Sequence, residues 1–367
     1  MLVSQLFNPA PIISLKLRTV PTFTNEGDTD EVLIVYADKR AVCIDGASLW
    51  VCMRLANAQR NELLQTEQPS LTYKKWAFQS QTEISDLVSC GPASAMPLVP
   101  SSFNAVTVTM SKTSYSARFI GVGRPMITFY ATSDASRSFS LAGLMANRVT
   151  SAVTSAVYSF AKSFWHPTPT PTPPPSAYTD PNSPQTTTIA PPTTIPAILT
   201  LSDPHRHVTQ IHLCPPSRVT GKSPLAVLAD SLGRVMVLDV EEGEVIRMWK
   251  GWRGAQVGWI EREVEVGKSK PPPELETTQD AGSAPKKKRR TKLYLVLYAA
   301  RGVLEVYGMR RGERVAAFNA GVGYRLVQTC SGVVGGAYMP KEARDGWLSQ
   351  CYLVGGGGEV KRVVVSV

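Results

Sequence analysis

The chain has 367 residues, 43% of them hydrophobic and 19% charged, which provides enough apolar material for a folded core and excludes a chain that is disordered throughout. Its 39 lysines and arginines outnumber 29 aspartates and glutamates. Six of those cations lie in the single run Lys286–Lys292, which leaves 33 against 29 elsewhere, so net charge alone does not indicate a nucleic-acid-binding protein.

The N-terminal residues have neither a basic start nor an unbroken apolar stretch, so we expect no signal peptide. The longest strongly apolar run is Leu293–Ala300, far short of the ~20 residues of a membrane-spanning helix. Six scattered cysteines form no C-x-x-C pair, which favours reduced, buried thiols in a cytoplasmic protein.

Paired β-strands recur along the chain. An apolar strand, a turn containing Gly or Asp and a second strand appear at 32–44, 225–239, 293–307 and, more loosely, 352–367. Gly and Asp tolerate positive φ, so these turns favour hairpins. We therefore predict an all-β fold, a WD-like β-propeller of about six to seven blades, formed by residues 1–139, a signature blade at 199–262 and a last part at 292–367. A β-sandwich with additional elements is the alternative.

Residues 140–165 have helical rather than β periodicity. The apolar side chains of this predicted amphipathic helix share one face, opposite a face rich in Ser and Thr with few charges. Such a face either packs on the rest of the fold or inserts among lipid headgroups. The candidate membrane-contact residues are Leu141, Met145, Val149, Val153, Val157, Phe160 and Phe164.

Two segments have compositions that resist packing. Residues 166–198 are rich in Pro and Thr and are expected to form an extended, disordered linker. Residues 263–291 contain Pro271–Pro273, an acidic patch and then the basic run, and are expected to form a second disordered insertion. The basic run is best interpreted as a solvated loop with weak, salt-dependent attraction to anionic lipid or nucleic acid.

No assembled catalytic or metal-binding motif is found. Gly221-Lys222-Ser223 resembles the end of a phosphate-binding loop, but position 216 is Pro where that loop needs Gly. His205, His207 and His212 lack a second ligand cluster, which favours a solvated loop over a metal site. So few histidines also disfavour Ser/His or Cys/His catalysis, and we predict no metal, no cofactor and no enzymatic activity of the chain itself.

Three of the seven tryptophans and several cations lie between residues 247 and 260. Trp and Arg commonly anchor protein interfaces, and they pair through cation–π contacts. The alternative is that these tryptophans fill the gap between two blades. The candidate partner-binding residues are Arg247, Trp249, Lys250, Trp252, Arg253, Gln256 and Trp259.

The same stretch carries a family resemblance. The pattern D-x-x-G-R-V-x-x-L-D at 230–239, followed by I-R-M-W-K-G-x-R-x-A-Q-x-G-W-I at 246–260, resembles the non-catalytic (regulatory) subunit of the Rab GTPase-activating protein complex. Other blocks agree in order, namely 11–16, 44–49, 73–76, 144–165, 301–306 and 314–319. Members of that family are longer, and the resemblance covers their N-terminal propeller region, so an incomplete ring is expected.

The resemblance implies a heterodimer with a catalytic subunit that supplies the arginine finger. The complex stimulates GTP hydrolysis on Rab proteins and acts as a nucleotide-exchange factor for another Rab at the endoplasmic reticulum and lipid droplets. We therefore expect a cytoplasmic scaffold, peripherally associated with membrane, that binds the catalytic subunit and Rab GTPases and no specific nucleic acid. A generic WD-like adaptor for peptides, without a Rab link, is the alternative.

Overall fold

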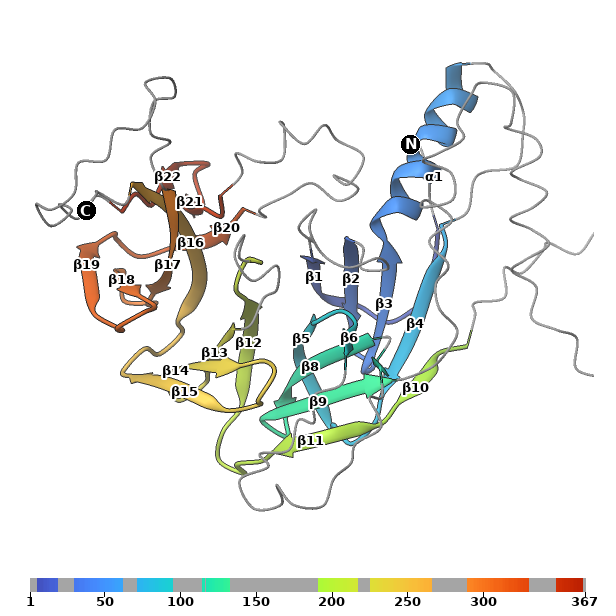
Figure 1. The fold of residues 1–367 in the computed structure, drawn as a ribbon, viewed down its shortest axis with the longest axis horizontal. Coiled ribbons are helices and arrows are strands. Elements are labelled where there is room, and N and C mark those ends of the chain that lie inside the picture. The colour runs from blue at the N-terminus through green and yellow to red at the C-terminus, as the bar shows by residue number, and fades with distance from the viewer. Residues whose placement is uncertain are drawn as a thin grey trace, which may run out of the picture.

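Five mainly antiparallel β-sheets lie side by side in an arc (Figure 1). The computed structural model describes residues 5–18, 30–61, 71–94, 114–115, 117–132, 191–216, 225–265, 289–329 and 348–365. The fold is therefore all-β with a propeller arrangement, as the sequence predicts. The described part contains five blades, fewer than the predicted six to seven, because insertions lengthen single blades and the residue count overestimates their number.

Blades 1 and 2 are interleaved in sequence. Blade 1 has the strand order β1 (Ile12–Arg18), β2 (Glu31–Tyr36), β3 (Arg40–Asp45), β4 (Tyr73–Phe78) and β10 (Thr193–Ile195). Blade 2 has the order β11 (Ala197–Leu201), β9 (Ile127–Thr132), β8 (Ala117–Arg124) and β5 (Glu83–Ser89). A separate short pair joins β6 (Ala93–Ser94) to β7 (Ser114–Tyr115). Among the strands that the structure describes, only β10 pairs in parallel, with β4.

Blades 3 to 5 are continuous in strand order. Blade 3 is β12 (Val208–Leu213), β13 (Leu225–Asp230), β14 (Arg234–Asp239) and β15 (Val245–Lys250). Blade 4 is β16 (Gln256–Glu265), β17 (Arg289–Tyr298), β18 (Val303–Gly308) and β19 (Arg314–Asn319). Blade 5 is β20 (Tyr324–Gln328), β21 (Cys351–Gly355) and β22 (Val360–Arg362).

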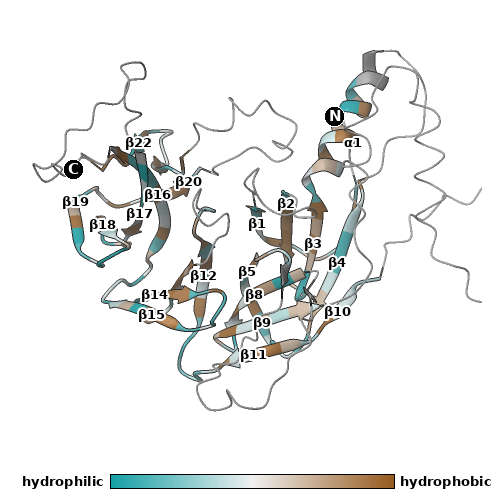
Figure 2. Ribbon diagram, viewed as in Figure 1, coloured by the Kyte–Doolittle hydropathy of each residue, from teal (hydrophilic) through white to brown (hydrophobic). Residues whose placement is uncertain are grey.

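The core lies between neighbouring blades. In β13, Ala226 and Leu228 pack toward blade 2, while Val227 and Ala229 pack toward blade 4. Because successive side chains of a strand point to opposite faces, a strand buried on both faces needs apolar residues at every position. Figure 2 shows this for β2 and β14, whose residues are mostly hydrophobic.

The predicted repeat of strand, turn and strand is confirmed by a repeated hydrogen bond. Gly233 and Gly302 end equivalent turns with φ of +86° and +87°. Their carbonyl oxygens accept the backbone N–H groups of Trp252 at 2.9 Å and Ala320 at 2.8 Å. Gly233 also has no room for a side chain, since a Cβ there would lie 2.8 Å from the backbone nitrogen of Arg253.

The first strand of each blade in chain order, which is β1, β5, β12, β16 or β20, runs in the same direction in all five blades. Gln256 and Trp259 of β16 bond, in that order, to Tyr324 and Gln328 of β20. Contacts in the same order join the other neighbouring first strands. Between blades 1 and 2, Lys16 binds Asp86 and Glu31 links Arg18 to Ser89. Between blades 2 and 3, Ser85 contacts His207 and Asp86 accepts the N–H of Ile211; between blades 3 and 4, Gln210 contacts Ala255 and Trp259 contacts His212.

This shared direction gives the arc two unlike sides. The second and third strands of every blade are joined on one side, at residues 37–39, 125–126, 231–233, 299–302 and 356–359. We call it the short-turn side. On the opposite side, which we call the long-loop side, the first strand of every blade ends and the second begins; β9 also ends there, and α1 (Gly46–Asn61) follows β3 there.

The helix α1 is an element that the sequence prediction missed. Asp45 precedes it and accepts the backbone N–H of Ser48 at 2.9 Å, as an N-cap does. Ala47, Cys52 and Ala56 are buried on it. The predicted helix at 140–165, with its seven candidate lipid-facing residues, lies outside the described residues. Within those residues, no helix has the length and apolar character needed to cross a bilayer.

The two insertions fall only partly within the described residues. Residues 193–198 of the predicted linker contribute to β10 and β11, so the ordered chain resumes earlier than expected. Residues 263–265 and 289–291 of the second insertion extend β16 and β17. The described cysteines are free and, except for half-buried Cys90, buried, as predicted; burial raises the pKa of Cys214 and Cys351 to about 12.

A charged cluster joins the first strands of blades 1, 2 and 3. Asp86 accepts Lys16 Nζ at 2.5 Å and the backbone N–H of Ile211 at 2.9 Å. Lys16 also donates to the carbonyl of Ile211. His212 lies beside this cluster, where burial and the charge of Lys16 lower its pKa to about 4 while Asp86 opposes the shift.

We expect His212 to make the fold sensitive to acid. Its pKa is about 4 in the folded chain and about 6.5 when unfolded, so between these values the unfolded state binds more protons. The free energy of unfolding should therefore fall as pH decreases from about 6.5 to 4. Denaturant titrations of wild type and His212→Gln across this range measure the difference, and equal pH slopes would contradict the assignment.

Candidate functional site

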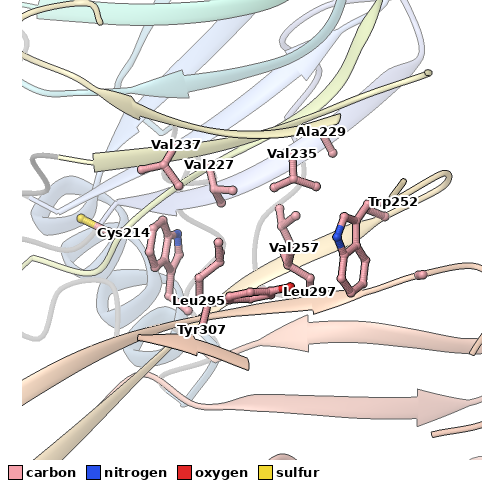
Figure 3. Close-up of a cluster of buried hydrophobic side chains, with 13 residues drawn as sticks. Cys214, Val227, Ala229, Val235, Val237, Trp252, Val257, Leu295, Leu297 and Tyr307 are labelled. Carbon is pink, nitrogen blue, oxygen red and sulfur yellow. The ribbon is translucent and has the colours of Figure 1, made fainter. Parts of the chain in front are cut away.

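The tryptophan-rich stretch lies where blade 3 meets blade 4. Figure 3 shows valines of β13 and β14 facing Leu295 and Leu297 of β17 across an apolar interface, with Trp252 at one end. Trp259 is fully buried, and its Nε1 donates to the carbonyl of His212 at 3.4 Å. Both tryptophans thus fill the gap between blades, and neither offers its ring to solvent.

Gln256 and the backbone of Trp259 join blade 4 to blade 5. Gln256 Nε2 donates to the carbonyl of Tyr324 at 3.1 Å, and its Oε1 accepts the N–H of Leu326 at 2.6 Å. The N–H of Trp259 donates to Gln328 Oε1 at 3.0 Å. These contacts satisfy buried polar groups of two first strands, which gives Gln256 a structural role in holding the blades together.

Strand β15 is the outer edge of blade 3 and is only partly covered. Trp249 packs on Tyr307 of β18 with ring centroids 5.1 Å apart. The guanidinium of Arg247 lies over Gly312, in the turn between β18 and β19. Both residues are partly exposed, so a partner bound along this edge could contact them from the outside.

The remaining candidates lie on the short-turn side. Lys250 ends β15 and Arg253 follows Trp252 in the connection to β16, and both side chains are exposed. The guanidinium of Arg301 lies 5.8 Å from the centre of the Trp252 ring, within cation–π range. Leu232 is 53% exposed in the neighbouring turn. We call Leu232, Lys250, Arg253 and Arg301 the short-turn patch.

The patch combines an exposed apolar side chain with three cations on a rigid base. Within the described residues, no carboxylate forms an ion pair with Lys250, Arg253 or Arg301, whereas Arg206 nearby is held by Asp203 and Asp230. The hydrogen bond from Trp252 to Gly233 fixes the connection between β15 and β16 against the turn that carries Leu232. A preorganised basic patch of this kind suits an acidic protein surface.

Residues 1–327 match the family model described as the Rab3 GTPase-activating protein regulatory subunit N-terminus. The chain belongs to this family. The resemblance noted at 230–260 is thereby confirmed, and it places the chain with the regulatory rather than the catalytic subunits of Rab GTPase activators.

The residues of the family signature at 230–239 and 246–260 have different roles in the fold. Asp230 is buried and accepts the N–H of Arg234 at 2.6 Å, so it shapes the turn before Gly233. Trp252 and Trp259 pack in the core between blades 3 and 4. Lys250 and Arg253 are the charged signature residues that the fold leaves exposed on the short-turn side, whereas Ile246 and Met248 are exposed along β15.

Two residues of the patch were missed from the sequence. Leu232 and Arg301 occupy the same position in equivalent turns, immediately before Gly233 and Gly302. Aligning the two hairpins places Leu232 beside the connection that follows β15 and Arg301 beside the one that follows β19, so the contact of Arg301 with Trp252 depends on how blades 3 and 4 pack. An exposed apolar residue in a tight turn was the available signal.

The three described histidines do not gather at one site. His207 Nε2 lies 2.6 Å from Ser85 Oγ, while His212 faces Lys16 and Asp86. In the part of the chain that the structure describes, no group of three His, Cys, Asp or Glu side chains could hold a metal ion.

Proposed function

We propose that the chain is the docking part of a heterodimeric Rab regulator, binding the catalytic subunit through the short-turn patch and positioning it toward a membrane-bound Rab. Family membership supports the regulatory role. The exposed cations of the patch, set on a rigid interface between blades, support direct contact with a partner. The chain contributes binding, and the arginine finger comes from the catalytic subunit.

The proposal also includes association of the chain with a membrane. A Rab on a membrane is met more often by a regulator that is itself held there, because effective concentration rises. We propose cytoplasmic residence with peripheral association with the endoplasmic reticulum or related membranes. Acting as an exchange factor for a second Rab belongs to this proposal and is tested by nucleotide-exchange assays on the heterodimer.

The test is the affinity of the chain for the catalytic subunit. We expect Lys250→Glu with Arg253→Glu to weaken binding by about tenfold or more, with a steep dependence on salt, because two favourable charges become repulsive. The matched control, Arg290→Glu with Lys292→Glu, makes the same change in net charge on the long-loop side. Unchanged affinity in the first variant, or equal loss in both, would contradict the assignment of the patch.

A peptide adaptor is the second candidate, and strand β15 favours it. This outer strand exposes Val245, Ile246 and Met248, with Ile246 53% exposed. An unpaired, apolar edge can add an extended peptide as a further strand. Capture of extended peptides along β15, with no affinity for the catalytic subunit, would favour this function instead.

A further inference from the structure

The first hairpin of blade 4 extends beyond its own sheet. β16 and β17 pair over ten residues each, from Gln256 with Tyr298 to Glu265 with Arg289. β18 pairs with β17 only from Tyr294 onward. Residues 261–265 and 289–293 therefore form a two-stranded ribbon on the long-loop side, which we call the β16–β17 ribbon.

Charge is separated between the two faces of this ribbon. Arg262 lies opposite Lys292, and Val264 lies opposite Arg290, so three cations share one face with no described carboxylate among them. Glu261 and Glu263 lie on the other face. Glu261 is buried there and accepts the backbone N–H of Ser349 at 3.1 Å.

Three cations on one face destabilise the β16–β17 ribbon unless an anion binds to that face. Like charges directly opposite each other on paired strands repel and destabilise the pair. Lys292 and Arg290 are exposed, while Arg262 is half-buried and donates to the carbonyl of Val365. An anionic surface placed against this face would reduce the repulsion, since negative charge would contact the exposed Arg290 and Lys292 beside Arg262.

The neighbouring turn adds charge of the same sign. The N–H of Met309 donates to the carbonyl of Leu293 at 3.2 Å, which holds the turn at 309–313 beside the ribbon. Arg310 and Arg311 are exposed in this turn, with Glu313 as its acidic residue. The basic surface is thus broad rather than a pocket for one small anion.

We propose that the cationic face of the β16–β17 ribbon, formed by Arg262, Arg290 and Lys292, binds the anionic phosphate headgroups of a membrane. A projecting row of cations suits a flat, charged surface. The ribbon face carries no exposed aromatic side chain on which bases could stack, which favours lipid over single-stranded nucleic acid. The proposal relies on the proposed membrane role only for its biological setting, and its test is independent of Rab.

Vesicle binding tests this directly with the chain of residues 1–367. Vesicles of phosphatidylcholine with phosphatidylserine provide the anionic surface, and pure phosphatidylcholine vesicles provide the neutral one. Arg290→Glu with Lys292→Glu should lower the affinity for anionic vesicles at least about 20-fold, since each cation near such a surface contributes roughly fivefold. Lys250→Glu with Arg253→Glu, the matched control on the short-turn side, should bind as wild type does.

The outcomes separate the alternatives. Unchanged vesicle binding by the ribbon variant, or equal loss in both variants, would overturn the proposal. Duplex DNA or RNA binding that is lost in the ribbon variant while vesicle binding persists would overturn it in favour of nucleic acid. Binding to neutral vesicles as tight as to anionic ones would assign the membrane contact to another element. If the ribbon variant loses vesicles but keeps the catalytic subunit, the two proposals stand separately.

Discussion

Replacing Trp259 by alanine should lower the free energy of unfolding by about 3–5 kcal/mol. The side chain is fully buried between blades 3 and 4 and donates a hydrogen bond to the carbonyl of His212. The substitution leaves a cavity in a packed interface and an unpaired buried carbonyl. Because domains are stable by only about 5–15 kcal/mol, the loss is a large fraction of the total.

Denaturant unfolding followed by circular dichroism measures this effect. Leu232→Ala is the control, because its side chain is exposed and should change stability by less than about 0.5 kcal/mol. Trp259→Phe should fall between the two, since it keeps most of the apolar volume and loses the hydrogen bond. A Trp259→Ala protein as stable as Leu232→Ala would show that the blades do not meet through this residue.

Replacing Asp86 by alanine should lower the free energy of unfolding by about 3–5 kcal/mol, because it breaks an ion pair rather than leaving a cavity. Its carboxylate accepts Lys16 Nζ at 2.5 Å and the N–H groups of Ile211 and Leu87, both at 2.9 Å. Removing it leaves a buried ammonium group without its counterion, and burial already lowers the pKa of Lys16. Blades 1, 2 and 3 are joined at this point, so all three should loosen.

A double substitution separates the ion pair from its surroundings. Lys16→Met with Asp86→Leu removes both charges together, and apolar replacement of a buried pair is often neutral or stabilising. We expect the double variant to recover much of the stability lost in Asp86→Ala, as measured by the same denaturant titration. A double variant less stable than Asp86→Ala would mean that the backbone contact to Ile211, rather than the charge pair, dominates.

Much of the architecture could be predicted because its signals are local. Strands such as β13 and β14 are continuous apolar runs, and the turn at Gly233 needs a residue that adopts positive φ. The number of blades could not be predicted from local sequence patterns. It depends on how much chain lies in insertions, and blade 2 alone runs from residue 83 to 201. Helix α1 was missed although Asp45 and Ser48 form a cap at its start.

The candidate site was only partly predictable for a related reason. Composition singled out the stretch from Arg247 to Ile260, but it could not separate buried from exposed members. That separation depends on which blade packs against each strand: Trp259 faces blade 3, and Gln256 reaches blade 5. Lys250 and Arg253 remain exposed because their connection lies on the short-turn side, and that side is defined only once the blades are in place.

The central expectation is that the two sides of the arc have different partners. The most direct measurement determines the affinities of both charge-reversal variants, Lys250→Glu/Arg253→Glu and Arg290→Glu/Lys292→Glu, for both the catalytic subunit and anionic vesicles. We expect the first variant to lose only the catalytic subunit and the second to lose only the vesicles. Equal losses of both ligands in the two variants, or no loss in either, would contradict it.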